Sequence, residues 1–126
     1  MKNVTLNFVH ISDNAFFSKD DKLNIIGVFG KAIVTDFPAL QPPFAVSLGI
    51  SGKKGLHPVN VEIFSPQSEP LISSKGNIEI LQDGGGGHFV ININGLIFSI
   101  PGRYVVRVTL DDGVANEDNY LTVDKQ

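Results

Sequence analysis

Apolar and polar residues alternate in short runs along most of the chain. Between Phe44 and Ile50 every second residue is large and apolar, and the residues between them are small. A period of two is typical of a strand with one face on a core and the other in water. The pattern predicts eight or nine short strands, over residues 4–11, 23–29, 31–35, 44–51, 57–63, 71–81, 89–100, 103–110 and 119–123. No window shows the 3.6-residue period of a helix, so we expect an all-β protein with one domain, residues 1–126.

The first run predicts which side chains enter the core. Phe8 continues the row of Val4 and Leu6, so we expect its ring in the core with His10 next on the same face. The histidine would then cover the edge of the core, as an amphipathic side chain commonly does.

Three other segments predict strand positions and loops. The run 23–29 carries apolar residues at both parities, as a central strand would, and Gly27 indicates a bend or bulge within it. The run 71–81 is weaker and is expected near a sheet edge. Four consecutive glycines, residues 84–87, predict a flexible loop.

One corner near the C-terminus indicates the type of sandwich. In immunoglobulin-like domains a Tyr at the start of a late strand returns its hydroxyl to backbone a few residues upstream. Gly102 and Tyr104 have the spacing of this structural corner, and Leu96 would fill the core beneath it. The Cys pair and the Trp of antibody domains are absent, so packing alone must hold the core. We therefore expect an antiparallel immunoglobulin-like β-sandwich; another sandwich topology and a jelly roll are the alternatives.

A further set of segments covers most of the chain and points to a family: Asp13-Asn14-Ala15, residues 22–29, Phe37-Pro38, residues 92–96 and Gly102-x-Tyr104. Together they resemble a family of small, uncharacterised bacterial proteins, a domain of unknown function with an immunoglobulin-like pattern. The resemblance implies a stand-alone bacterial domain. It implies no activity, cofactor or partner, and no functional residue comes with it.

Composition and charge narrow the classes of partner. The formal net charge is −3, which argues against nucleic acid and against a polybasic contact with membranes. No Cys is present, which excludes disulfides, thiol catalysis and thiolate metal sites. The first ten residues alternate like a strand and lack the continuous apolar core of a signal peptide. A soluble, cytoplasmic protein is therefore expected.

Candidate chemistry is sparse. The three histidines are spaced so that nothing brings them together as metal ligands, and the four glycines precede a strand, whereas a phosphate-binding loop precedes a helix. Acidic pairs in predicted turns could bind calcium, but Asp also favours turns for its own backbone hydrogen bonds. These pairs are Asp20-Asp21, Asp111-Asp112 and Glu117-Asp118. No nucleophile elbow or carboxylate pair stands out. We predict no catalytic, cofactor-binding or metal-binding residue.

Aromatic and proline residues in two predicted loops are candidate partner contacts. They are Phe16, Phe17, Phe37, Pro42 and Pro43. Adjacent aromatics in a loop can form an exposed contact patch, or they can plug one end of the sandwich. The leading hypothesis is a non-enzymatic binding or scaffold module that contacts another protein or a copy of itself. A small-ligand or carbohydrate-binding module, assisted by calcium, is the alternative, and an enzyme of unrecognised type is the third.

Overall fold

The computed structural model describes residues 3–111 and 113–126, which form eleven strands and no helix. The strands are β1 (Val4–Phe17), β2 (Leu23–Val28), β3 (Lys31–Val34), β4 (Ala39–Leu40), β5 (Phe44–Gly52), β6 (Gly55–Phe64), β7 (Pro70–Ile80), β8 (Gly85–Ile93), β9 (Ile97–Phe98), β10 (Gly102–Leu110) and β11 (Gly113–Lys125). None of these residues forms an apolar helix of membrane-spanning length.

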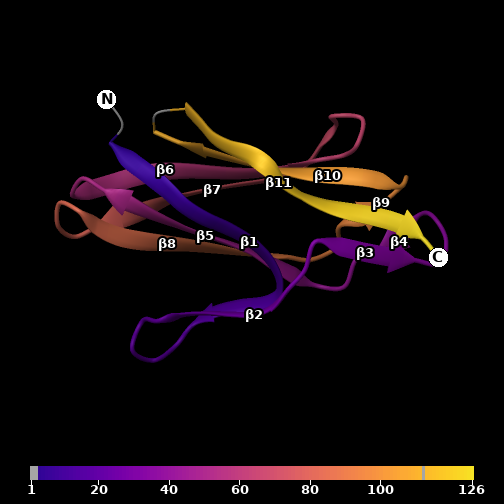
Figure 1. Cartoon of the computed structure of the whole chain (residues 1–126), viewed down its shortest axis with the longest axis horizontal. Helices are drawn as coiled ribbons and strands as arrows, with labels where there is room; N and C mark the ends of the chain where they lie inside the picture. The colour runs from indigo at the N-terminus through magenta and orange to yellow at the C-terminus, as the bar shows by residue number, and fades with distance from the viewer. Residues whose placement is uncertain (1–2, 112) are drawn as a thin grey trace.

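Two sheets pack face to face in the body of the molecule (Figure 1). The four-stranded sheet has the order β2-β1-β5-β8, and the five-stranded sheet has the order β3-β11-β10-β6-β7. A small third sheet pairs β4 with β9. Neighbouring strands run antiparallel except β3, which pairs parallel with the C-terminal end of β11. The predicted immunoglobulin-like sandwich is confirmed, with eleven described strands in place of the expected eight or nine.

The core lies between the inner faces of the two sheets and is almost entirely aliphatic. Its most fully buried side chains include Leu48, Ile80 and Val61. The inward row of β6 begins at His57 as predicted, and β7 is an edge strand as predicted. These regions confirm that the period-two pattern identifies core-facing residues where the strand is regular.

The structural corner has the hydrogen bond that its spacing predicts. The Tyr104 hydroxyl donates to the Ile100 carbonyl over 2.7 Å, and the Tyr104 side chain is 1% exposed. Its ring meets Phe98 edge-on with the ring centres 4.8 Å apart, and Leu96 is buried beside them in the core. Gly102 has a φ of 131°, and a Cβ there would come 2.8 Å from the Pro66 ring. Only glycine fits this start of β10.

A bulge in β1 overturns the predicted position of Phe8. The pairing of β1 with β5 shifts register between Leu6 and Phe8, so one extra residue enters β1. Val9 is therefore buried in the core, while Phe8 and His10 lie on the outer face of the four-stranded sheet. An inserted residue reverses the faces of every residue that follows it.

Three of the four glycines belong to strand β8 and not to a flexible loop, and Gly84 lies in the turn before it. Gly85, Gly86 and Gly87 pair with the end of β5. A Cβ on Gly87 would clash with the Ile78 side chain of β7, and a Cβ on Gly76 of β7 would come 2.6 Å from the Phe89 ring of β8. Glycines on both strands thus let the two sheets approach closely where β7 and β8 meet, which closes this edge of the sandwich.

Candidate protein-binding surface

The end of β1 and all of β2 form a two-stranded ribbon outside the sandwich body, which we call the arm (residues 14–28). β1 turns back on itself before the arm, and the arm runs beneath β5 and β8 as a partial third layer (Figure 1). At the base of the arm Gly27 has a φ of 72°, and any Cβ there would clash with the Asp13 carboxylate. The bend expected at Gly27 is present. The strand 23–29 was predicted to be central and is instead the edge of its sheet.

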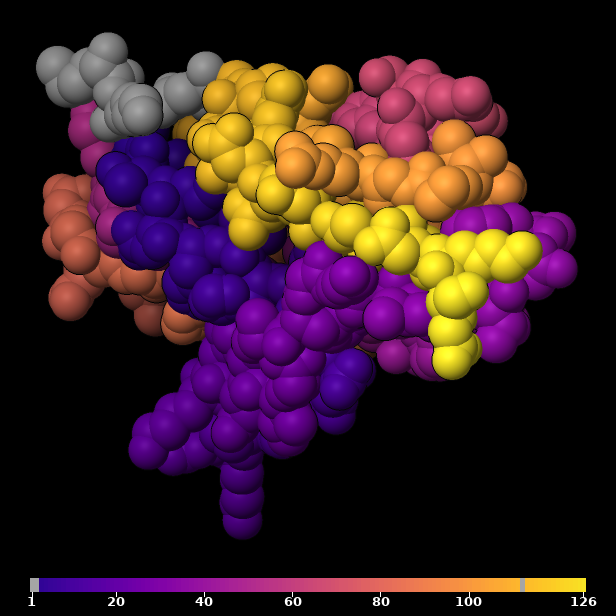
Figure 2. Space-filling view, turned by 45° about the vertical axis from the view of Figure 1, so that its right-hand side comes forward, coloured from indigo at the N-terminus to yellow at the C-terminus, as the bar shows by residue number. Residues whose placement is uncertain are grey.

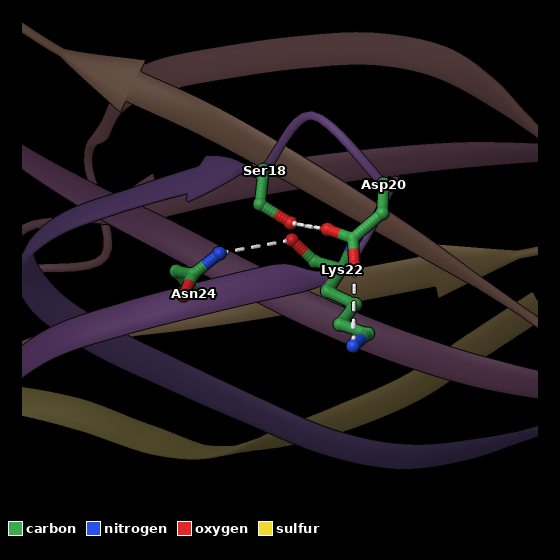
Figure 3. Close-up of polar contacts among 4 residues, drawn as sticks. All are labelled: Ser18, Asp20, Lys22 and Asn24. Carbon is green, nitrogen blue, oxygen red and sulfur yellow. Dashed lines mark hydrogen bonds and ion pairs between the residues drawn. The ribbon is translucent and has the colours of Figure 1, made fainter.

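The tip of the arm is a tight polar turn (Figure 3). The Ser18 amide donates to the Lys22 carbonyl over 2.8 Å, and the Ser18 hydroxyl donates to Asp20 Oδ1 over 2.6 Å. Lys22 Nζ lies 3.1 Å from Asp20 Oδ2, and the side-chain amide of Asn24 donates to the Lys22 carbonyl. The hydrogen bond from Ser18, followed by the contact with Lys22, lowers the pKa of Asp20. These contacts fix the turn and hold the two strands of the arm in register.

One face of the arm covers the outer face of the four-stranded sheet. Ala15 on this face is 3% exposed. The Phe17 ring lies 6.5 Å from the His88 ring of β8 but is itself 48% exposed, so the cover is closest at Ala15. Beneath this layer β5 is buried on both faces, and Ser47 is fully buried although its face was expected to be wet. The arm and the Phe8 ring, which lies over Gly49, account for this difference.

The opposite face of the arm carries three exposed apolar side chains, which alternate with the polar residues that pair with them, Asn24, Asn14 and Ser12. The register of β1 and β2 places Phe16, Ile26 and Val28 on this face, and their exposed fractions are 42%, 53% and 60%. Phe16 was predicted in a loop, but it lies in a strand that projects from the body (Figure 2). It is not a plug over the end of the sandwich. We call Phe16, Ile26 and Val28 the arm face.

The other predicted contacts lie apart from the arm. Phe37 is half-buried and packs against the core, so only part of its ring is available to a partner. Pro42 and Pro43 are exposed between β4 and β5, and β4 lies well away from the arm tip in Figure 1. Pro42 lines a shallow hollow with Leu40, which is 67% exposed. The five predicted residues therefore do not form one surface, since Phe16 and Phe17 lie on opposite faces of the arm and the other three lie elsewhere.

The structure brings two of the three histidines near one another. His10 and His88 both contact the Phe8 ring, with ring centres 5.2 and 5.9 Å from it. Their sequence spacing gave no sign of this, because the bulge in β1 decides it. Among residues 3–111 and 113–126, no group of three or more His, Cys, Asp or Glu side chains could hold a metal ion.

His57 makes a polar clamp at one end of the sandwich. Its Nδ1 lies 2.9 Å from Asp111 Oδ2, and its Nε2 lies 2.7 Å from the Lys53 carbonyl oxygen. Both ring nitrogens of His57 thus lie within hydrogen-bond distance of an oxygen atom. With both ring nitrogens engaged, the side chain ties the β5–β6 turn to the end of β10, and neither nitrogen faces an open site.

One residue of each acidic pair has a basic side chain as its partner. Asp20 contacts Lys22, Asp111 contacts His57, and Glu117 Oε1 lies 2.8 Å from Arg107 Nε. Asp112, the second residue of the predicted β10–β11 turn, lies outside the described residues. These three carboxylates are therefore paired with side chains of the protein itself.

Comparisons with known proteins place the chain in a family. The model of a family of unknown function matches residues 7–119. The chain belongs to this family, DUF6941. This confirms the resemblance drawn from the sequence segments above, which extend from Asp13 to Tyr104.

A solved structure agrees on the fold. An immunoglobulin-like protein from Pseudomonas aeruginosa is similar to the chain with a TM-score of 0.50 and 15% sequence identity, over 97% of each chain. At this identity the likeness concerns the fold alone. No curated protein matches the sequence. The comparisons therefore support the architecture and assign no function to the DUF6941 domain.

Sequence reasoning missed two of the three residues of the arm face. Ile26 and Val28 were read as the buried side chains of a central strand. One signal was present in the sequence, since the segment 18–22 between the two strands is short and polar. Such a connection is typical of a hairpin, which would have placed Phe16 and Ile26 on neighbouring strands.

Proposed function

We propose that this DUF6941 domain is a non-enzymatic protein-binding module that contacts its partner through the arm face. The observation that supports it is the exposure of Phe16, Ile26 and Val28 side by side on a strand pair outside the sandwich body. Contiguous exposed apolar groups on a soluble domain often mark an interaction site. Asn24 lies directly opposite Phe16 and Asn14 directly opposite Ile26, so polar groups alternate with the apolar ones on this face.

The arm suits such a role because it combines an open face with an ordered frame. A lone two-stranded ribbon is marginally stable in water. Here the face that carries Ala15 and Phe17 lies over the sheet, and the turn at Asp20 fixes the tip. A partner would therefore meet a preorganised surface and lose little entropy in ordering it. Phe16 offers the aromatic anchor common at interface centres.

The test is capture of a partner with and without the arm face. Tagged wild-type protein is used to recover proteins from a lysate of the source cells, in parallel with Phe16→Ser, Ile26→Ser and the control Leu56→Ser. Leu56 is 64% exposed on β6, so its variant removes a comparable apolar group from another surface. The proposal expects one stoichiometric partner that both arm variants lose and the control retains. Retention by the arm variants contradicts it.

The partner could also be a second copy of this chain. A measurement of the molecular mass in solution distinguishes this case from binding to a different protein. Light scattering during gel filtration over a hundred-fold range of protein concentration shows whether a second copy is the partner. A dimer that Ile26→Ser dissociates and Leu56→Ser preserves would identify it. A monomer throughout leaves a different protein as the partner.

The engaged state of both His57 nitrogens also supports a non-enzymatic role, because a general base needs a free nitrogen facing its substrate. The cytoplasmic location expected from the sequence is part of the proposal. Cell fractionation with tagged protein tests it, and recovery in a membrane or extracytoplasmic fraction contradicts it.

A further inference from the structure

A groove on the outer face of the five-stranded sheet carries two arginines. Val105 of β10 lies opposite Tyr120 of β11 on one side and Phe64 of β6 on the other. Directly paired residues share a sheet face, so these three side chains form a row across the strands. Arg103 and Arg107 lie two residues before and after Val105, on the same face of β10.

Each arginine lies over one ring of this row. The guanidinium carbon of Arg103 is 4.4 Å from the centre of the Tyr120 ring, and that of Arg107 is 4.3 Å from the centre of the Phe64 ring. Both cationic heads therefore turn inward over the same row from its two sides. Contact with an aromatic face restricts a guanidinium that would otherwise move freely.

The two cations differ in how far they are neutralised. Arg107 Nε is 2.8 Å from Glu117 Oε1, so the two side chains form an ion pair. The Nε atom is buried, but the geometry of this contact is not that of a hydrogen bond. Glu62 also lies opposite Arg107 on this face. Within residues 3–111 and 113–126, no carboxylate lies within ion-pair distance of Arg103. The Arg103 end of the groove thus holds an uncompensated positive charge in a protein of net charge −3.

One wall of the groove is a rigid turn with hydroxyl groups. The groove is lined by Ser65, Pro66 and Ser68 beside Arg103, Val105 and Arg107, and Glu117 lines it at the Arg107 end. Ser65 Oγ accepts hydrogen bonds from the backbone amides of Gln67 and Glu69, which leaves its O–H proton free to donate. The Pro66 ring packs against the backbone at Gly102, directly before Arg103.

We propose that this groove binds an oxyanion, a carboxylate or phosphate group carried on a flat apolar ligand, with Arg103 as its anchor. A planar guanidinium pairs with two oxygens of such a group in parallel hydrogen bonds. The hydroxyl groups of Ser65 and Ser68 are additional hydrogen-bond donors along the groove. Val105 and the aromatic rings beside it offer an apolar surface for the rest of the ligand. The inference is independent of the arm, which lies on the other sheet.

NMR titration of the isotopically labelled full chain at constant ionic strength tests this site. Phenyl phosphate and benzoate are the probes, because they present the two oxyanions on one aromatic body. Saturable shifts confined to β10, β11 and residues 64–68 are expected for at least one probe, and the probe that saturates identifies the anion. Absence of saturable shifts with both probes would overturn the proposal.

Variants separate the anchor from general charge. Arg103→Gln should weaken binding by about ten-fold or more, as loss of a charge-assisted contact predicts. Arg103→Lys keeps the charge without the planar fork and should give an intermediate loss. Lys75→Gln removes one exposed cation elsewhere on the same sheet and should leave affinity unchanged. Equal affinity in wild type and Arg103→Gln, or equal losses in Arg103→Gln and Lys75→Gln, would show that no specific site exists.

Discussion

The core beneath the Tyr104 corner and the arm contain the same kinds of residue in opposite environments. Phe98 is fully buried between the sheets, whereas Phe16 on the arm is 42% exposed. Both belong to strands, and both lie in alternating runs. The difference is that the sandwich body supplies a second layer over Phe98 and none over the arm face. An apolar strand residue is therefore a core residue only where the fold covers it.

The largest expected effect comes from matched Phe→Ala substitutions in the two regions. Phe98→Ala leaves a cavity beside Tyr104 and should lower the free energy of unfolding by about 3–5 kcal/mol. Phe16→Ala removes an exposed ring and should change it by about 0.5 kcal/mol or less. Urea denaturation measures both values, and Phe98→Leu serves if the alanine variant does not fold. Similar losses at the two positions would remove the contrast between core and arm.

A smaller effect is expected where the two sheets close. Gly87→Ala would push a methyl group into Ile78 and the backbone near Glu79, and overpacking of this kind costs about 1–3 kcal/mol. Gly30→Ala is the control, since nothing lies within 4 Å of a Cβ at that position. Thermal unfolding followed by circular dichroism compares the two. An unchanged melting temperature for Gly87→Ala would mean that the strands β7 and β8 separate without cost.

The hydrogen bond of the Tyr104 hydroxyl contributes less to the free energy of unfolding than the packing of its ring does. Tyr104→Phe keeps the contact with Phe98 but leaves the Ile100 carbonyl without its donor. The expected loss is about 1–1.5 kcal/mol in the free energy of unfolding. Denaturant titration of the wild type and the variant side by side provides the measurement. A difference near zero would assign the role of Tyr104 to packing alone.

The smallest effect is local to the arm and depends on pH. The folded turn lowers the pKa of Asp20 through Ser18 first and Lys22 second, so the turn is stabilised while Asp20 is ionised. That contribution is complete above the ordinary Asp pKa of 3.8 and is lost as the pH falls through the lowered value. NMR titration should show the Ser18 and Lys22 amides shifting in this range. Asp20→Asn should abolish the shift without changing global stability.

Local sequence patterns predicted the strands, the all-β class and the corner well, because each depends on neighbours within a few residues. Tyr104 reaches Ile100, four residues away, and Gly102 fits its turn for a local reason. The arm face was predicted only in part. Phe16 was named as a contact, but its strand was not recognised, and neither were Ile26 and Val28 on the same face.

Two of the failed predictions have different physical causes. A single inserted residue between Leu6 and Phe8 reversed the faces of the rest of β1. Alternation before such a bulge does not predict which residues face the core after it. The glycines at 84–87 indicated freedom of the backbone, whereas close approach of Ile78 from another strand is what requires Gly87.

By itself the sequence determined the secondary structure and the identity of most core positions, since burial of alternate residues is the dominant favourable term in forming the sandwich. Tertiary structure alone decided which apolar faces stay uncovered and which charges stay uncompensated. The arm face is exposed because β1 folds back beyond the body, and within residues 3–111 and 113–126 the strands that flank β10 bring no carboxylate to Arg103. The exposure of the arm face and the charge at Arg103 both depend on which segments, distant in the sequence, lie close together in space. A hydrophobic pattern along the chain does not contain those distances.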